Sequence, residues 1–168
     1  MRKMMALIAG LFCLASLICF IASFFGLNLN RLGPKMFLLH AGIFAVGLPL
    51  IAVDKIKARA HRLSPRELNS SRTPPWLSHI SLGLFLLFLV MFVSFLLLSH
   101  AAMPDIKDGE YILNSHGKII GYISEKDYFW LKTWELRFFA SGWLCLYFKL
   151  MIDWWFPEYL ETPWTVER

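Results

Sequence analysis

The chain has 168 residues, of which 57% are hydrophobic, 16% are aromatic and only 17% are charged. Water-soluble domains of this length rarely have so few charged residues, so the composition argues against a soluble enzyme or a soluble binding domain. The formal net charge is +5, but six of the seventeen Lys and Arg residues lie within residues 54–75, which favours lipid headgroups over nucleic acid as their partner.

Four long apolar stretches follow one another along the chain, at residues 4–27, 36–53, 76–102 and 138–156. Each has at least 18 residues. A helix rises about 1.5 Å per residue, so each stretch can cross a hydrocarbon core of roughly 30 Å. In lipid, a helix satisfies its own backbone polar groups. The sequence therefore predicts an all-α membrane protein whose residues 1–168 form a single domain of four transmembrane helices.

The first apolar stretch follows Arg2 and Lys3, an arrangement that a secretory signal also has. Its 24 residues exceed the roughly 7–15 residues of a signal core, so we interpret it as a retained span. Small residues at four-residue spacing, such as Ala6 with Gly10, predict that this helix packs closely against another helix.

Lys and Arg residues are concentrated in the loops that four spans would place on one side of the membrane. These loops are the N-terminus and residues 54–75, whereas the loop at residues 103–135 balances its basic residues with acidic ones. Short loops rich in Lys and Arg stay on the cytoplasmic side. We therefore expect both termini in the cytoplasm and residues 103–135 outside it. The residues predicted to contact anionic lipid headgroups are Lys55, Lys57, Arg59 and Arg62.

The loop at residues 103–135 has the clearest local pattern outside the predicted spans. Residues 110–113 and 118–123 are rich in β-branched and aromatic residues, as strands are, and Asn114 and Gly117 begin and end a tight turn between them. This pattern predicts a small extracytoplasmic β-hairpin between the third and fourth helices. Two strands alone are marginally stable in water, so we expect the hairpin to lie against the bundle or a partner.

The fourth helix is expected to begin before the membrane. Ser124 is placed to cap it, and Glu125 and Asp127 favour the positive end of the helix dipole. The next residues mix aromatic and charged side chains, as an interfacial segment does. Together with the hairpin they suggest a docking surface for another protein, for which the candidate residues are Tyr111, Tyr122, Trp130 and Trp134.

Ionisable residues in or beside a span are a first place to look for function, because burying them is costly. His40 and His100 are expected near the outer face, where His116 of the hairpin, Glu135 and Arg137 would join them. Imidazoles at one depth can hold a metal ion or haem iron, or relay protons. The alternative, which we favour, is a set of interfacial histidines bonded to water, backbone or Glu135. No metal or other cofactor is therefore predicted.

Lys149 and Asp153 lie four residues apart on one face of the fourth helix. At this spacing the two side chains can neutralise each other, so we interpret them as a structural ion pair. The alternative is a polar pocket or ion path that the pair would line inside the membrane.

Several local motifs resemble a family of uncharacterised bacterial inner-membrane proteins, in the same order from about residue 36 to residue 148. The resemblance implies a bacterial inner-membrane location and a shared topology, and it transfers no catalytic residue. In that family a His often precedes the Trp of the fourth helix, where this chain has Gly142, which weakens a histidine-ligand hypothesis. The motifs are Leu-His-Ala-Gly-Ile-Phe at 39–44, Leu-Pro at 48–49, Pro-Pro-Trp-Leu at 74–77, Asn-Ser-His-Gly-Lys at 114–118 and Glu-Leu-Arg-Phe-Phe-Ala-Ser-Gly-Trp at 135–143.

Three functions from different classes remain open. The first, which we favour, is an accessory or interaction subunit of a membrane assembly that binds another membrane protein. The second is a metal- or haem-binding redox protein that uses His40 and His100. The third is a small transport or immunity-type protein that uses Lys149 and Asp153. Catalysis is not predicted, because the sequence offers no nucleophile–base pair and no phosphate-binding loop.

Overall fold

The computed structural model describes residues 2–61 and 74–156 of the chain. The protein is mostly helical with a small antiparallel sheet. A short helix, α2 (Leu29–Leu32), and a 3₁₀ turn, η1 (Gly33–Lys35), connect the first two long helices. The long helices are α1 (Arg2–Ser23), α3 (Met36–His61), α4 (Pro75–Leu98) and α5 (Glu125–Trp155), and the strands are β1 (Met103–Lys107), β2 (Glu110–Ser115) and β3 (Lys118–Tyr122).

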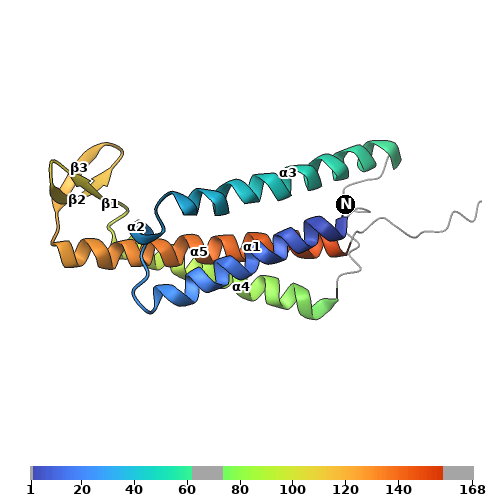
Figure 1. Cartoon of the computed structure of the whole chain (residues 1–168), viewed down its shortest axis with the longest axis horizontal. Helices are drawn as coiled ribbons and strands as arrows, with labels where there is room; N and C mark the ends of the chain where they lie inside the picture. Colours follow the sequence, from blue (N-terminus) through green and yellow to red (C-terminus); the bar gives the residue numbers. More distant parts are fainter. Residues whose placement is uncertain (1, 62–73, 157–168) are drawn as a thin grey trace, which may run out of the picture.

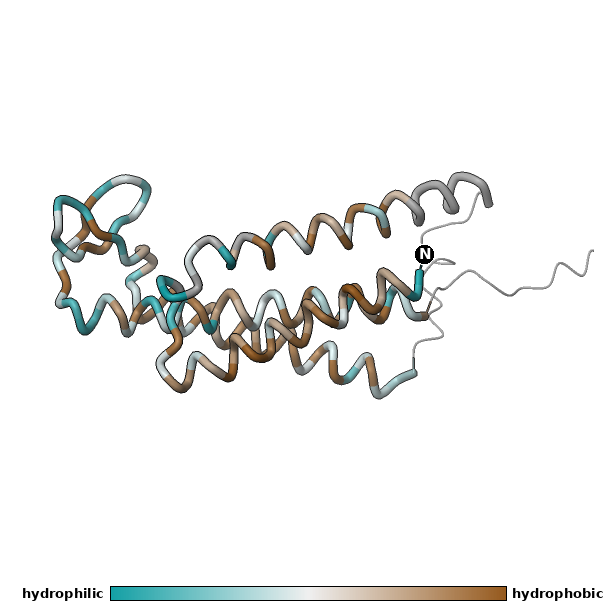
Figure 2. The backbone as a smooth tube through the Cα atoms, in the orientation of Figure 1, coloured by the Kyte–Doolittle hydropathy of each residue, from teal (hydrophilic) through white to brown (hydrophobic). Residues whose placement is uncertain are grey.

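Helix α5 is the central helix of the bundle. It packs along α1 and α4, and α3 contacts both α5 and α1 (Figure 1). The sheet lies at one end of the bundle, beside the start of α5, and the N-terminus lies at the other. We call these the sheet end and the N-terminal end. Hydrophobic residues predominate along the helices, whereas hydrophilic residues gather at the sheet end (Figure 2).

Small residues allow α1 to approach α5 closely. The buried residues of α1 are Ala6, Ala9, Ser16 and Ser23, whose spacing of three or seven residues keeps them on one helix face. The hydroxyls of Ser16 and Ser23 donate to carbonyls of their own helix, at 2.8 and 2.6 Å. The predicted close packing of this helix is therefore confirmed, and the serine hydroxyls in the contact are hydrogen-bonded.

Helix α1 ends at Ser23, short of the predicted boundary at residue 27. Gly26 has a φ of +88°, and the N–H of Leu27 donates to the carbonyl of Ala22 at 3.2 Å. The N–H of Gly26 donates to the carbonyl of Ser23 at 3.4 Å. A left-handed residue that closes the last turn in this way is a Schellman cap. Glycine adopts that conformation without strain, which explains why the helix stops inside an apolar stretch.

Two hydrogen bonds join side chains of α5 to the backbone of α3. The Tyr147 hydroxyl donates to the Leu39 carbonyl, and the Trp154 indole N–H donates to the Val46 carbonyl at 3.2 Å. Both helices run from the sheet end toward the N-terminal end. Since the two donors are seven residues apart and so are the two acceptors, both bonds lie along one parallel helix contact.

Gly42 leaves the space that the Tyr147 side chain occupies. A Cβ atom at position 42 would collide with the Tyr147 Oη and lie 3.1 and 3.2 Å from ring atoms of Phe12. The Phe12 ring stacks on the Tyr147 ring with 5.0 Å between centroids. Helices α1, α3 and α5 therefore meet at Gly42, where any side chain larger than a hydrogen atom would clash with Tyr147 and Phe12.

The predicted β-hairpin is confirmed as strands β2 and β3. They are joined by His116 and Gly117, whose φ angles of +50° and +83° suit the tight turn that matches strand twist. Asn114 accepts a hydrogen bond from the Gly117 N–H at 3.0 Å, and the bonded pairs include Ile112 with Tyr122. The sheet rests on α5 through contacts of Leu113 with Leu131.

The prediction of only two strands was wrong, because β1 adds a third strand beside β2. Because proline is unusual inside a sheet, Pro104 makes this strand difficult to predict from the sequence. The signal that was missed is Asp108-Gly109, which forms the β1–β2 turn with φ angles of +53° and +84°.

The predicted early start of the last helix is confirmed. Helix α5 begins at Glu125, and the Ser124 Oγ accepts from the Asp127 N–H at 3.1 Å. This bond satisfies one of the free donors of the first turn.

Helices α1 and α4 are each long and apolar enough to cross a membrane, by length and composition alone. They are not buried core helices, because large apolar side chains such as Leu11 and Leu97 are 68% and 71% exposed. Helix α3 has a shorter apolar segment, Leu38–Ala52. Lys149 and Asp153, with several Trp and Tyr residues, make α5 less apolar. Within the described residues, two of the four predicted spans, α1 and α4, therefore have the length and hydropathy of a membrane-spanning helix.

Replacing Gly42 by Ala should destabilise the protein, because the new Cβ displaces Tyr147 from the Leu39 carbonyl. We expect a loss of roughly 1–3 kcal/mol, measured as a lower Tm of the purified protein in mild detergent. Gly47→Ala is the matched control, since Gly47 lies on the same helix and a Cβ there would lie 3.7 Å from Leu150, an ordinary contact. Equal Tm values for the two variants would contradict this role of Gly42.

Candidate functional site

The structure divides the four aromatic residues of the predicted docking surface into two pairs. Tyr122 and Trp130 are 68% and 46% exposed at the sheet end. Tyr111 is half-buried against the start of α5, and the half-buried Trp134 ring lies 4.7 Å from the guanidinium of Arg137. Tyr122 and Trp130 are therefore available to a partner, whereas Tyr111 and Trp134 contribute to internal packing.

The two edges of the sheet are protected in different ways. In β1, Pro104 has no N–H, and the Asp105 side chain accepts from the Ile106 N–H at 2.8 Å. Strand β3 contains no proline, and no side chain in the described part of the chain bonds to its backbone. The β1 edge thus carries two features that discourage added strands, and β3 carries two others, Lys118 at its start and a bulge at Ile120, which has no partner in the register with β2. The exposed apolar residues of β3 are Ile119, Ile120 and Tyr122, at 41%, 56% and 68%.

The histidines of the predicted outer cluster occupy different surroundings. His40 packs edge-on against Phe139 and Trp143, with 5.3 and 5.0 Å between ring centroids. His100 and His116 are exposed in turns, both with positive φ angles. Across residues 2–61 and 74–156, no group of three or more His, Cys, Asp or Glu residues is placed to hold a metal ion.

Glu135 is buried and paired with a neighbour on its own helix. Only 6% of it is exposed, and its carboxylate lies 2.9 Å from the Lys132 Nζ. Burial raises the pKa of Glu135 above its ordinary value, and the Lys132 ammonium opposes part of that rise. Lys132 also lies 5.8 Å from the Tyr128 ring centroid, so the ion pair belongs to the packing beneath the sheet.

Arg137 contacts the C-terminus of α1. Its Nη2 donates to the Ser23 carbonyl and its Nε to the Ser23 Oγ, both at 3.4 Å, and its guanidinium lies 4.4 Å from the Phe24 ring centroid. A cation at this end stabilises the helix dipole, and α1 has no basic residue in its own last turn. Although Glu135 and Arg137 are two residues apart, they therefore bind different partners.

The Lys149 ammonium and the Asp153 carboxylate form an ion pair. Their side chains are 61% and 30% exposed, which places the pair on the outer surface of α5. Of the predicted headgroup contacts, Lys55, Lys57 and Arg59 lie on the backbone of α3, but their side chains are outside the described part of the structure. Arg62 lies outside the described residues.

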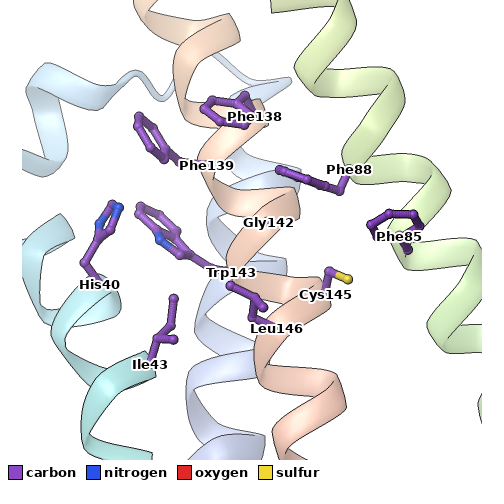
Figure 3. Close-up of a pocket in the computed structure, with 10 residues that line it drawn as sticks. All are labelled: His40, Ile43, Phe85, Phe88, Phe138, Phe139, Gly142, Trp143, Cys145 and Leu146. Atoms are coloured by element: carbon purple, nitrogen blue, oxygen red, sulfur yellow. The ribbon is translucent and has the colours of Figure 1, made fainter. Parts of the chain in front are cut away.

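An apolar groove runs across α5 between α3 and α4 (Figure 3). Its volume is about 370 Å³, and we call it the aromatic groove. Sequence reasoning missed it because its walls come from three helices. The local hint is that six of its lining residues fall within two of the motifs, His40 and Ile43 in residues 39–44 and Phe138, Phe139, Gly142 and Trp143 in residues 135–143. The groove is lined by His40, Ile43, Phe85, Phe88, Phe138, Phe139, Gly142, Trp143, Cys145 and Leu146.

In comparisons with known proteins, no family model, no curated protein and no solved structure matches the chain. The family resemblance drawn from the motifs therefore stays a prediction.

Lowering the pH should stabilise the protein through Glu135. Its raised pKa means that the folded state binds this proton more tightly than the unfolded chain does, so Glu135 lowers stability above its folded pKa. The free energy of unfolding should therefore rise as the pH falls through the folded pKa toward the ordinary glutamate value. Glu135→Gln should lack this rise in a profile of Tm against pH, and Glu110→Gln, at an exposed position of β2, should keep it. Parallel profiles for the wild type and Glu135→Gln would overturn the assignment.

Replacing Arg137 by Met should loosen the C-terminus of α1, because the hydrogen bonds to Ser23 and the contact with Phe24 are lost. We expect a cost of about 1 kcal/mol, measured as a lower Tm and as faster hydrogen exchange of the last turn of α1. Arg31→Met, at an exposed arginine of α2, is the control and should leave both measurements unchanged. Unchanged exchange in the Arg137 variant would show that Arg137 does not hold this helix end.

Proposed function

We propose that the chain is a multi-pass protein of a bacterial inner membrane with both termini in the cytoplasm, crossed by α1, α3, α4 and α5. The exposed apolar side chains of α1 and α4 support this placement, because a soluble bundle would bury such faces. The central position of α5 supports its crossing, since the polar groups of Tyr147 and Trp154 bond to carbonyls of α3 and Lys149 is neutralised by Asp153. The packing of α1 along α5 supports retention of α1 in the folded protein.

Within this membrane placement, the proposed function is that of an accessory subunit, without catalysis of its own, that binds another membrane protein. The observation that carries this proposal is the set of exposed apolar side chains on β3, an edge strand of the sheet. An exposed edge strand offers unpaired N–H and C=O groups to an extended segment of another chain. The exposed Ile120 and Tyr122 would give such a segment apolar contacts in addition to backbone hydrogen bonds.

The other two hypotheses have less support. His40 and His100 differ in their surroundings, since His40 lies among aromatic rings and His100 is exposed in a turn. Lys149 is largely exposed on α5, which favours a surface ion pair over a lined ion path. The β3 edge is the feature that neither of these hypotheses uses.

Replacing Ile120 by Lys should abolish partner binding, because a charged residue on an edge strand discourages the addition of another strand. We expect recovery of the partner by affinity purification from native membranes in mild detergent to fall about tenfold or more, as loss of a central interface contact does. Quantitative mass spectrometry of the retained proteins is the measurement.

Ile106→Lys is the matched control, since Ile106 is 49% exposed on β1, the edge strand that contains Pro104, and Ile120 is 56% exposed on β3. It should retain the partner at wild-type yield. A photo-crosslinking residue at position 120 should also form an adduct that the same residue at position 106 does not. Recovery of the wild-type chain alone, with no adduct at position 120, would overturn the proposed function.

A further inference from the structure

We propose that a cleft between the α1–α2 connection and α5 binds the head group of an anionic phospholipid, with Arg31 paired to the phosphate. We call it the interfacial cleft. It lies apart from the apolar residues of β3 that carry the accessory role. The proposal rests on the membrane placement of the helices and not on partner binding.

The interfacial cleft lies just beyond the end of an apolar helix. Helix α1 ends at Ser23, and the chain that follows it forms one wall. Helix α2 packs against α5 beside it (Figure 1). In the proposed membrane this position is the boundary between hydrocarbon and head groups. The volume of the cleft is about 580 Å³, and its lining includes Asn28, Asn30 and Arg31 on one side and Phe129, Trp130 and Thr133 of α5 on the other.

The charge of the lining selects an anion. Arg31 is exposed, and no Asp or Glu is among the described residues that line the cleft. The ion pairs in the described part of the chain are Lys132 with Glu135 and Lys149 with Asp153, so no carboxylate there neutralises the Arg31 guanidinium. A guanidinium can bind a phosphate through two parallel hydrogen bonds. A head group that also carries an ammonium would be repelled by Arg31, which favours a lipid with a net negative charge.

Asn28 provides a second, independent indication of a ligand. It lines the cleft although only 7% of it is exposed. Its Oδ1 accepts from the Arg31 N–H at 3.2 Å, whereas its Nδ2 donates to no group in the described part of the chain. The unpaired side-chain atoms that are fully enclosed do not include this Nδ2, so it is accessible from the cleft. A nearly buried amide without an acceptor is costly, and a phosphate oxygen in the cleft would supply the acceptor.

Asn30 offers the complementary group. Its Nδ2 donates to the Tyr128 hydroxyl at 2.9 Å, so its Oδ1 is the part of the amide that can accept from a ligand. A head group with a hydroxyl beside its phosphate suits a cation, an amide donor and an amide acceptor together. Phosphatidylglycerol has this combination, because its phosphate is negative and its glycerol carries free hydroxyls.

The aromatic wall suits the apolar part of the same lipid. Phe129 and Trp130 are exposed, and the Trp130 ring meets Trp134 edge-on with 6.1 Å between centroids. Aromatic rings of this kind favour the depth at which head groups meet acyl chains. Beyond the cleft, Ile18 and Ile21 are exposed on the outer face of α1 and offer an apolar surface to the acyl chains.

The test is a titration of the purified full-length protein, in a neutral detergent, with phosphatidylglycerol that carries a fluorescent acyl chain. We expect saturable binding with a dissociation constant about tenfold lower than for phosphatidylcholine labelled in the same way. Arg31→Met should raise the dissociation constant for phosphatidylglycerol about tenfold. Lys35→Met is the matched control and should leave it unchanged, since Lys35 is an exposed cation of the same connection that does not line the cleft.

A further variant tests the amide. Asn28→Asp keeps an oxygen for the Arg31 N–H but replaces the donor with a negative group, so it should also weaken binding about tenfold. The basic residues at 55–62 are the same in every variant, so lipid that they bind contributes equally. The comparison of the two lipids uses the wild-type protein and decides the matter even if a variant fails to fold.

Three results would overturn the proposal. They are equal dissociation constants for the two lipids, equal constants for the wild type and Arg31→Met, and displacement of the lipid by inorganic phosphate at comparable concentration. The last result would assign the cleft to free phosphate. Partner capture at β3 is measured separately, so failure of either proposal is distinguishable from failure of the other.

Discussion

The hydrogen bonds that Tyr147 and Trp154 of α5 donate to carbonyls of α3 determine how the bundle is built. A hydroxyl or an indole N–H that faces hydrocarbon has no partner, so both side chains must point into the protein. Helix α5 must therefore be surrounded. The small residues of α1 allow close contact on one side of it, α4 covers another, and Gly42 leaves room for the Tyr147 ring on α3. The outer helices consequently carry the most apolar surface, and the central helix carries the polar groups.

This arrangement explains which parts of the fold can be predicted from the sequence. Length and apolarity predict all four long helices, and local capping predicts the start of α5 at Ser124, because these signals need no distant partner. The end of α1 was misplaced because Gly26 closes the helix inside an apolar stretch. Strand β1 was missed because Pro104 masks it. Hydropathy alone separates α1 and α4 from α5, since it counts each polar side chain without seeing that Lys149 pairs with Asp153 or that Tyr147 and Trp154 are buried.

The candidate sites show a similar division. Grouping residues by expected depth places Glu135 beside Arg137, but the helix turns their side chains to Lys132 and to Ser23. His40 was identified as a candidate from its position in a span, yet its surroundings come from α3, α4 and α5 together and have no local signal. The exposed edge of β3 likewise depends on the strand order, which no periodicity in the sequence specifies.

Single-cysteine labelling tests most directly whether α1, α3 and α4 all cross the membrane between the N-terminus and the sheet. With the native residues Cys13, Cys19 and Cys145 replaced, Lys3→Cys and His116→Cys place one thiol at each end of the bundle, both at exposed positions. We predict that a membrane-impermeant maleimide labels the cysteine at 116 in cells with a permeabilised outer membrane, and labels the cysteine at 3 only after lysis. If α3 does not cross, only α1 and α4 cross before the sheet. The sheet would then lie on the same side of the membrane as the N-terminus. Equal labelling of both cysteines in intact inner membranes would therefore contradict the four-span topology.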